Sequence, residues 1–331
     1  MSSTQLRWGV LGAAAIAGQA VIPAILAAEG QVAALASRDQ ERGRELSSRF
    51  SIPLLFRTYQ ELVEAELDAV YIPLPNSLHL PWSLQAMAAG KHVLCEKPLA
   101  LSAAEARQLG AAAHDRGVVL AEAVMYRHHP RWQTVRQLIT SGELGRPRHL
   151  QGSFTFPLDP APNIRWEAEL GGGALYDVGS YLVSASRWLF GEPTRVLARQ
   201  ELWHGVDRDG SMLLEFGGAD GPISAELAFS FAAAEHQQLE VIGTEGSLLV
   251  PAPFTAWRGE EIPLWLRRGP VGAAQAVATS AADPYQEMVL AFTARVRGGP
   301  PLPTTPKDSE LGLRVLDAAR RSVVEGAWAR P

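Results

Sequence analysis

The residue best suited to chemistry in this sequence is Lys97, because the chain otherwise uses arginine. Of its 30 lysine and arginine residues, only Lys91, Lys97 and Lys307 are lysines. Lys97 follows the apolar stretch 93–95, which is typical of a short buried strand, and precedes Pro98, which ends strands and helices alike. An ammonium is therefore expected at the carboxyl end of a strand, where open α/β sheets bind ligands and a lysine can polarise a substrate oxygen. A plain surface lysine is the alternative.

The first 120 or so residues alternate between strand-like and helix-like patterns, and these elements would position Lys97. Strands are predicted over 6–11, 32–36, 69–72, 92–95 and 118–121, and helices over 13–28, 39–50, 80–89 and 103–116. Such alternation is typical of a doubly wound parallel sheet with helices on both faces. The overall fold class is therefore α/β in this half of the chain.

From about residue 148 the pattern changes to β-rich runs. Strands are predicted over 149–156, 195–203, 211–216, 223–231 and 239–250, with a hairpin turn at 243–246 and helices over 174–190 and 309–325. This pattern favours an α+β domain built on a large, mostly antiparallel sheet. We place the domains at 1–123 and 124–331, with the last helix a candidate to pack back on the first domain.

The turn after the first strand predicts a dinucleotide site. It reads Gly9-Val10-Leu11-Gly12-Ala13-Ala14-Ala15-Ile16-Ala17. Gly12 keeps the tight turn and Ala17 is an accepted small residue, but Ala14 replaces the glycine that usually lets the backbone approach the pyrophosphate. The helix start still offers free N–H groups to phosphate. Gly12, Ala13, Ala14, Ala15 and Ile16 are the predicted phosphate-binding residues, and an ordinary strand-to-helix turn is the alternative.

The end of the second predicted strand indicates which dinucleotide binds. An acidic residue there holds the ribose hydroxyl of NAD, whereas arginine accommodates the 2′-phosphate of NADP. Here Ser37 takes the position of the acid and Arg38 follows it. Asp39 lies past the strand end and is expected to cap the next helix. NADP is therefore the predicted cofactor, and NAD the less favoured one.

The composition excludes several function classes. The 331 residues are 47% hydrophobic and 20% charged, with a net charge of -5 and a pI near 5.9, so no basic surface is expected for nucleic acid or membrane. Cys95 is the one cysteine and is expected to be a buried small hydrophobe. The polar start and the lack of a long apolar run predict a cytoplasmic protein. No spaced Cys/His set indicates a metal, and no nucleophile-elbow or P-loop motif occurs.

Several motifs together resemble those of the Gfo/Idh/MocA family of NAD(P)-dependent oxidoreductases. Besides the glycine turn and Glu96-Lys97-Pro98, they are the stretches 71–79, 122–130 and 171–181. Within the family, these motifs most resemble those of the branch that contains dimeric dihydrodiol dehydrogenase, NADP-dependent xylose dehydrogenase, 1,5-anhydrofructose reductase and glucose-fructose oxidoreductase. The resemblance implies a Rossmann domain that binds NADP, followed by an open-faced sheet through which a homodimer or homotetramer forms.

The stretch 171–181 supplies a candidate acid/base. Three glycines are expected to give a flexible approach to the helix over 174–190, on which Asp177 and Tyr181 at i and i+4 share one face. The inositol-dehydrogenase branch has histidine where Tyr181 stands, so its acid/base residue cannot be carried over to this chain. The acid/base role of the branch that has tyrosine can. A phenol titrates near pH 10, and Lys97 is the cation expected to favour its phenolate. Lys97, Tyr181 and Asp177 are the predicted catalytic residues, with a core tyrosine as the alternative.

The remaining site residues follow from the same resemblance. The cofactor is expected to contact Ser37, Arg38, Pro73, Leu74, Asn76, His79, Glu96 and Lys97. The substrate is expected to contact Arg127, His128, Trp166 and Tyr181.

The predicted function is reversible hydride transfer between NADP(H) and a sugar-like secondary alcohol, lactol or dicarbonyl, by a dehydrogenase or reductase acting on CH–OH groups. Tyr181 would exchange the proton, Lys97 would stabilise its phenolate and Asp177 would orient the pair. Two alternatives stay open. One is a catalytically silent NADP-binding sensor, and the other is a glucose-fructose type of enzyme that never releases its cofactor.

Overall fold

The computed structural model describes residues 5–160, 162–218, 221–255, 260–269 and 272–331. The chain divides into two compact units. The first comprises Met1–His128 and Tyr285–Glu310, and the second His129–Pro284 and Leu311–Pro331. These units differ from the predicted ranges 1–123 and 124–331, chiefly because residues 285–310 return to the first unit.

The described strands of the first unit form one parallel six-stranded sheet, in the order β3-β2-β1-β4-β5-β6. They are β1 (Arg7–Leu11), β2 (Gln31–Ala36), β3 (Leu54–Phe56), β4 (Ala69–Ile72), β5 (His92–Cys95) and β6 (Leu120–Glu122). The strand order reverses between β1 and β4, which is where doubly wound sheets bind their ligands. The glycine turn after β1 and the loop after β5 both leave this carboxyl edge.

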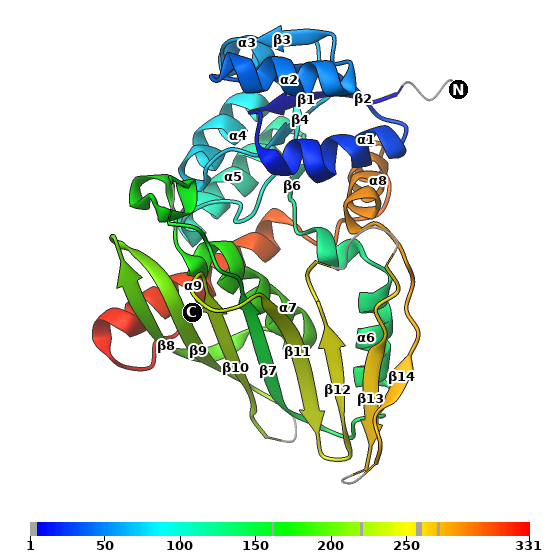
Figure 1. Cartoon of the computed structure of the whole chain (residues 1–331), viewed down its shortest axis with the longest axis vertical. Helices are drawn as coiled ribbons and strands as arrows, with labels where there is room; N and C mark the ends of the chain where they lie inside the picture. The colour runs from blue at the N-terminus through cyan, green and yellow to red at the C-terminus, as the bar shows by residue number, and fades with distance from the viewer. Residues whose placement is uncertain (1–4, 161, 219–220, 256–259, 270–271) are drawn as a thin grey trace. The chain divides into compact units, whose positions relative to one another are not determined.

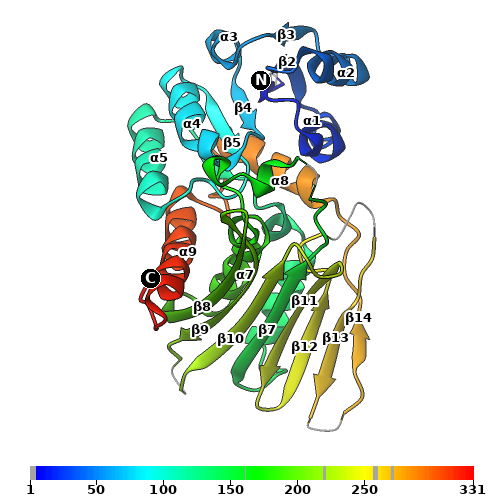
Figure 2. The same ribbon diagram turned by 60° about the vertical axis from the view of Figure 1, so that its left-hand side comes forward.

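Helices cover both faces of this sheet. They are α1 (Ile22–Ala27), α2 (Gln40–Phe50), α3 (Tyr59–Glu64), α4 (His79–Ala88), α5 (Ala103–Arg116) and α8 (Pro284–Val296). α4 and α5 lie on one side, and α1 and α8 lie on the other (Figure 1, Figure 2). α8 reaches the core of the unit, since the fully buried Trp8 ring lies 5.2 Å from that of Phe292. The helix from the second half of the chain that packs in the first unit is thus mainly α8, not the last helix, and the sequence analysis had predicted no helix there.

The second unit holds a mixed eight-stranded sheet among its described residues, in the order β14-β13-β12-β11-β7-β10-β9-β8. Its strands are β7 (Pro147–Thr155), β8 (Pro193–Trp203), β9 (Val206–Phe216), β10 (Ile223–Ser230), β11 (His236–Gly243), β12 (Gly246–Pro251), β13 (Leu264–Arg268) and β14 (Gln275–Val277). Only the central pairing of β7 with β10 is parallel among these. The predicted fold class, with a mostly antiparallel second sheet, is confirmed.

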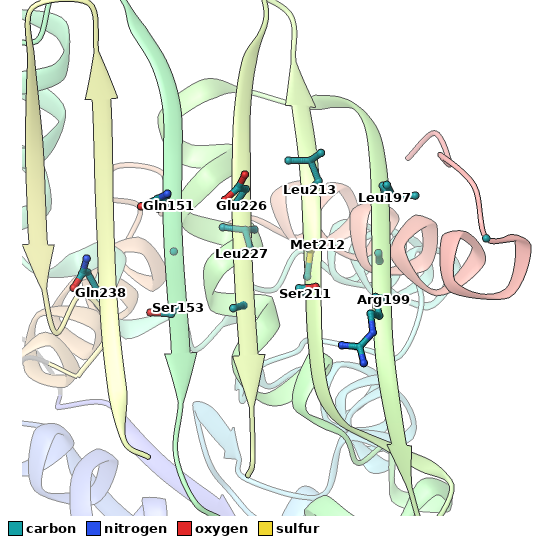
Figure 3. A pocket seen from close by; sticks show the side chains of 14 residues that line it. Gln151, Ser153, Leu197, Arg199, Ser211, Met212, Leu213, Glu226, Leu227 and Gln238 are labelled. Atoms are coloured by element: carbon teal, nitrogen blue, oxygen red, sulfur yellow. The ribbon is translucent and has the colours of Figure 1, made fainter. Parts of the chain in front are cut away.

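One face of this sheet is packed against helices. They are α6 (Arg131–Thr140), α7 (Ser180–Phe190) and the part of α9 (Pro306–Glu325) that belongs to this unit. The other face presents alternate side chains of neighbouring strands, including Gln151, Leu213 and Glu226 (Figure 3). These side chains line a shallow hollow, so the predicted open face is present.

The elements that the sequence predicted are present with shifts of a few residues at their ends, and the hairpin at 243–246 joins β11 to β12. Six elements of the described residues were missed, namely the short β3, α3, β13 and β14 and the longer helices α6 and α8. Within the described ranges, no helix is both long and apolar enough to cross a membrane.

Candidate active site

The loop after β5 holds Lys97 at the carboxyl edge of the parallel sheet, as the sequence predicted. The preceding Glu96 accepts a hydrogen bond from the hydroxyl of Tyr71 at the end of β4 (2.6 Å). Burial, reinforced by the Glu96 charge, raises the pKa of Tyr71 well above its ordinary value. Tyr71 therefore keeps its proton and remains a donor, which fixes the residue beside Lys97 to the neighbouring strand.

His79 ties the same loop to the turn after β4. Its Nδ1 lies 2.8 Å from the Pro98 carbonyl oxygen and its Nε2 lies 2.8 Å from that of Leu74. Burial lowers the pKa of His79 and the Lys97 charge lowers it further, whereas the contacts with the Pro98 and Leu74 carbonyls raise it. The structure thus gives His79 a bracing role, and its predicted contact with a cofactor stays a prediction.

Glu122 braces the loop from the next strand. Its carboxylate accepts hydrogen bonds from the Leu99 N–H (3.0 Å) and from the Ser309 hydroxyl at the start of α9 (2.6 Å). Burial raises the pKa of Glu122, which the Ser309 and Leu99 hydrogen bonds oppose. With Tyr71 and His79, it fixes the backbone on both sides of Lys97, whose side chain is half-buried.

The glycine turn after β1 fits a phosphate group. Gly12 has a φ of +110°, and a Cβ there would lie 2.9 Å from Leu74 Cδ2, so a larger residue would strain the turn. Its N–H donates to the Ala36 carbonyl (2.8 Å), which closes the turn onto β2. Residues 15–27 then form a continuous helical segment whose first N–H groups have no partner within the helix. Ala13 to Ile16 line this start.

At the end of β2, the predicted cofactor-selecting residues take distinct roles. Asp39 caps α2, because its Oδ1 accepts from the N–H groups of Glu41 and Arg42 at 3.1 Å. Ser37 is buried and donates its hydroxyl to the Asp39 carbonyl (2.6 Å). Arg38 is exposed, with its guanidinium 5.9 Å from the centre of the Tyr59 ring. The carboxylate of Asp39 is thus engaged in the cap, as expected.

Arg127 and His128, both predicted to contact substrate, lie in the turn after β6. The Arg127 side chain is 2% exposed and pairs with Asp308 (3.0 Å). Substrate contact through Arg127 stays a prediction that would require this buried pair to open. Burial, with the Arg127 charge, lowers the pKa of His128 to about 4, so its ring is neutral at physiological pH. A neutral imidazole could donate or accept a hydrogen bond there.

In the second unit, Asp177 and Tyr181 lie on the predicted helix, whose first turn differs from an α-helix. Residues Leu175–Gly179 form a π-helical turn that leads into α7. Asp177 pairs with Arg165, whose Nε lies 2.6 Å from its Oδ2. The sequence did not predict this arginine, and the role of Asp177 in orienting a Lys97–Tyr181 pair stays a prediction.

The Tyr181 ring packs against two phenylalanine rings that are stacked on each other. Its centroid lies 5.6 Å from that of Phe154 on β7 and 5.2 Å from that of Phe254 after β12. Only 9% of the tyrosine is exposed. Such packing fixes the ring independently of its hydroxyl. Trp166 belongs to a neighbouring aromatic group, with its ring 4.5 Å from Trp203, and its predicted substrate contact stays a prediction.

The remaining cofactor candidates, Pro73, Leu74 and Asn76, lie in the turn after β4, beside Gly12 in the case of Leu74. In the part of the chain that the structure describes, no group of three or more His, Cys, Asp or Glu side chains could hold a metal ion. Cys95 is buried, and burial raises its thiol pKa well above the ordinary value.

Comparison with known proteins accounts for both units. Residues 6–124 match the model of an oxidoreductase family with an NAD-binding Rossmann fold, and residues 132–249 match the Gfo/Idh/MocA C-terminal domain. The fold and these matches define an oxidoreductase with a dinucleotide-binding domain. The chain belongs to the Gfo/Idh/MocA oxidoreductase family, which confirms the resemblance seen in the sequence.

Several relatives match almost end to end. An oxidoreductase of Rhizobium meliloti is 41% identical over 98% of both chains, and a D-xylose 1-dehydrogenase (NADP(+)) of Haloferax volcanii is 37% identical over 97% of this chain and 98% of its own. The 3-ketoreductase KijD10 of Actinomadura kijaniata, solved with NADP and TDP-benzene, is 33% identical with a TM-score of 0.90, over 96% of this chain and 98% of its own. Its variants with one tyrosine changed to phenylalanine or one lysine changed to alanine match similarly.

Proposed function

We propose that this protein transfers a hydride reversibly between NADP(H) and a sugar-like secondary alcohol, lactol or dicarbonyl. The observation that carries the proposal is the bracing of Lys97 at the carboxyl edge of the parallel sheet, from which the phosphate-binding turn also leaves. The named relatives include a sugar dehydrogenase and a ketoreductase, which supports this class of substrate.

The residues at the β1 and β2 ends fit NADP. Gly12 gives the turn the shape that phosphate binding requires, and Ala13 to Ile16 would hold the pyrophosphate through their N–H groups. Asp39 is engaged by the α2 cap, so Arg38 is the charged side chain available to a 2′-phosphate. The NADP named with the xylose dehydrogenase and with KijD10 agrees with this preference.

The protein's own part in the reaction is to move a proton. When bound, the nicotinamide ring would donate or accept the hydride. In oxidation, Tyr181 takes the substrate hydroxyl proton, and Lys97 stabilises the resulting phenolate. Supporting this pair, the lysine and tyrosine replaced in the KijD10 variants are separated by the same number of residues as Lys97 and Tyr181.

A silent NADP-binding sensor is the second candidate, and one experiment separates the two. The protein is mixed with NADPH or NADP and a panel of pentoses, hexoses, inositols, dicarbonyls and nucleotide-linked ketosugars, and absorbance at the NADPH band is followed. An enzyme changes the NADPH concentration with at least one substrate pair at a rate proportional to protein. Tight NADPH binding with no turnover across the panel would instead support the sensor. Nicotinamide retained through purification would indicate an enzyme that does not release its cofactor.

We also propose that a second copy of the chain covers the open sheet face. Leucine side chains lie there beside arginine, glutamate and glutamine side chains, so this face offers both apolar surface and hydrogen-bonding groups to a second copy (Figure 3). Light scattering after size-exclusion chromatography should give a dimer or tetramer mass, and Leu213→Arg should lower it. A monomeric wild type would contradict the proposal.

A further inference from the structure

The start of the helix that carries Tyr181 is hydrogen-bonded to a carboxylate on a strand that is distant in the sequence. Asp207, near the beginning of β9, accepts a hydrogen bond from the Leu175 N–H at 2.5 Å. This N–H belongs to the first π-helical turn, where the helix has no internal partner for it. A negative charge at a helix start is also favoured by the helix dipole. Asp207 therefore caps this helix from outside its own sequence.

The glycine stretch is shaped to admit that carboxylate. Gly173 has a φ of +109°, and a Cβ there would overlap the Asp207 carboxylate. A Cβ on Gly172 would lie 2.5 Å from the Arg165 carbonyl oxygen, which shows equally close packing on the other side. The sequence predicted that these glycines give flexibility. The structure adds a packing role, because Gly172 and Gly173 let Asp207 and the 165–167 segment close tightly on the helix start.

The charge on Asp207 is costly. Burial raises its pKa to about 6, although hydrogen bonds from the Leu175 and Ala174 N–H groups and the charge of Arg320 oppose the rise. Arg320 on α9 is also hydrogen-bonded to the Tyr176 hydroxyl (2.9 Å), and on the same strand Arg208 pairs with Asp209. Since the folded pKa lies above the unfolded value, the ionised group lowers stability as pH rises through about 6. A costly buried charge of this kind is common where function requires it.

We propose that ionised Asp207 is a positioning residue for Tyr181, which it serves by holding the π-helical turn that leads into α7. This inference rests on the proposed function of Tyr181. The carboxylate touches neither substrate nor cofactor in this account. It fixes the direction of the helix start, and the Phe154 and Phe254 rings then fix the tyrosine side chain.

The test is the isosteric variant Asp207→Asn, measured as kcat and KM against pH. We expect kcat at pH 7.5 to fall by about tenfold, and by no more than the ~100-fold that misplacing a reacting group costs. KM should change little. The wild-type kcat should decline below about pH 6 as Asp207 protonates, and that decline should be absent from the variant. Asp209→Asn on the same strand is the matched control and should keep the wild-type profile.

Thermal unfolding separates this role from an ordinary structural cap. Relative to Asp207→Asn, wild type should lose stability as pH rises from about 4 to 7, because only wild type must bury the charge. The variant should then be at least as stable as wild type at pH 7.5 while being slower. A variant that unfolds earlier at pH 7.5 and keeps wild-type kcat would overturn the inference.

Failure of the acid/base role of Tyr181 can be distinguished from failure of the positioning role of Asp207. If Tyr181→Phe keeps nearly the wild-type turnover, the proposed acid/base role of Tyr181 is wrong, and the positioning role of Asp207 is wrong with it. If Tyr181→Phe abolishes turnover while Asp207→Asn keeps both the rate and the acid decline, only the positioning role is wrong. NADPH binding followed by fluorescence should be unchanged in Asp207→Asn, which confirms that the first unit is intact.

Discussion

Lys97 and Tyr181, the two proposed catalytic residues, are held in opposite ways. Around Lys97 the protein fixes the loop that carries the lysine, through the hydrogen bonds of Glu96, His79 and Glu122. Around Tyr181 the protein fixes the ring itself, against the stacked rings of Phe154 and Phe254. Lys97 is thus positioned through the backbone of its loop, whereas Tyr181 is positioned through its own ring, on a helix start that Asp207 caps.

This difference shows which substitutions test chemistry alone. Replacing Tyr181 by phenylalanine leaves the ring packing intact and removes only the hydroxyl. Replacing Lys97 leaves the three loop braces in place, because none of them uses the lysine side chain. A change in turnover in either variant can therefore be attributed to the lost functional group. The predictions below test whether the two residues are positioned in these different ways.

Tyr181→Phe is expected to have the largest effect. A general acid/base contributes roughly 100-fold to 10,000-fold, so turnover should fall by that factor while the melting temperature stays close to wild type. Steady-state kinetics and thermal unfolding measure both. Phe154→Leu keeps the tyrosine hydroxyl but removes one of the rings that hold Tyr181, so it should lower both the melting temperature and kcat. A Tyr181→Phe enzyme with wild-type turnover would show a purely structural tyrosine.

Lys97→Arg should come next. Arginine keeps the charge but has a planar head that is not deprotonated, so a site that needs a compact ammonium should lose more than about tenfold in kcat while NADP binding survives. Lys91→Arg is the matched control, since Lys91 lies six positions earlier, before β5, and should be neutral. Retention of more than about a tenth of the turnover, roughly 1.4 kcal/mol of barrier, would mean that only positive charge matters.

Arg38→Ala tests the cofactor. Loss of a charge-assisted contact should weaken NADP by roughly 1.5 to 3 kcal/mol and NAD hardly at all. Titration of both cofactors by fluorescence measures this difference. Arg42→Ala, which removes an exposed arginine of α2 close by, is the control. Equal losses for both cofactors would refute the assignment of Arg38 to the 2′-phosphate.

Glu122→Gln should have the smallest effect. Glutamine can still accept a hydrogen bond from the Leu99 N–H, and His79 and Glu96 brace the same loop, so kcat should change by no more than several-fold, about 1 kcal/mol. Kinetics at saturating substrate measure it. A loss as large as that of Lys97→Arg would show that the loop is not redundantly braced.

The sequence predicted the parallel sheet, the phosphate turn and the position of Lys97 because each depends on a local pattern. Short buried strands followed by glycine or proline are readable without tertiary information. β13, β14 and α6 were missed because their patterns are short or mixed. α8 could have been predicted, because its buried Tyr285, Met288, Val289 and Phe292 recur at helical spacing, but nothing in that pattern shows that the helix joins the first unit. Contacts between segments far apart in the chain leave no periodic signal.

The residues that support the site were harder to predict than the site itself. Glu122 could have been noticed, since it follows a predicted strand within a motif that had been singled out. Arg165 and Asp207 could not, because the ion pair with Asp177 and the cap at Leu175 depend on tertiary contacts. The close packing beside Gly172 and Gly173 was missed for the same reason, since only the folded structure shows what fills the space beside them.

The most direct test of the central claim is a double-mutant cycle between Lys97 and Tyr181. Turnover is compared in wild type, Lys97→Met, Tyr181→Phe and the double variant, with NADP and the best substrate found in the panel. If the two residues act as one acid/base unit, the double variant should be about as slow as the slower single variant. If the losses multiply, the two residues act independently and the proposed proton-transfer pair is contradicted.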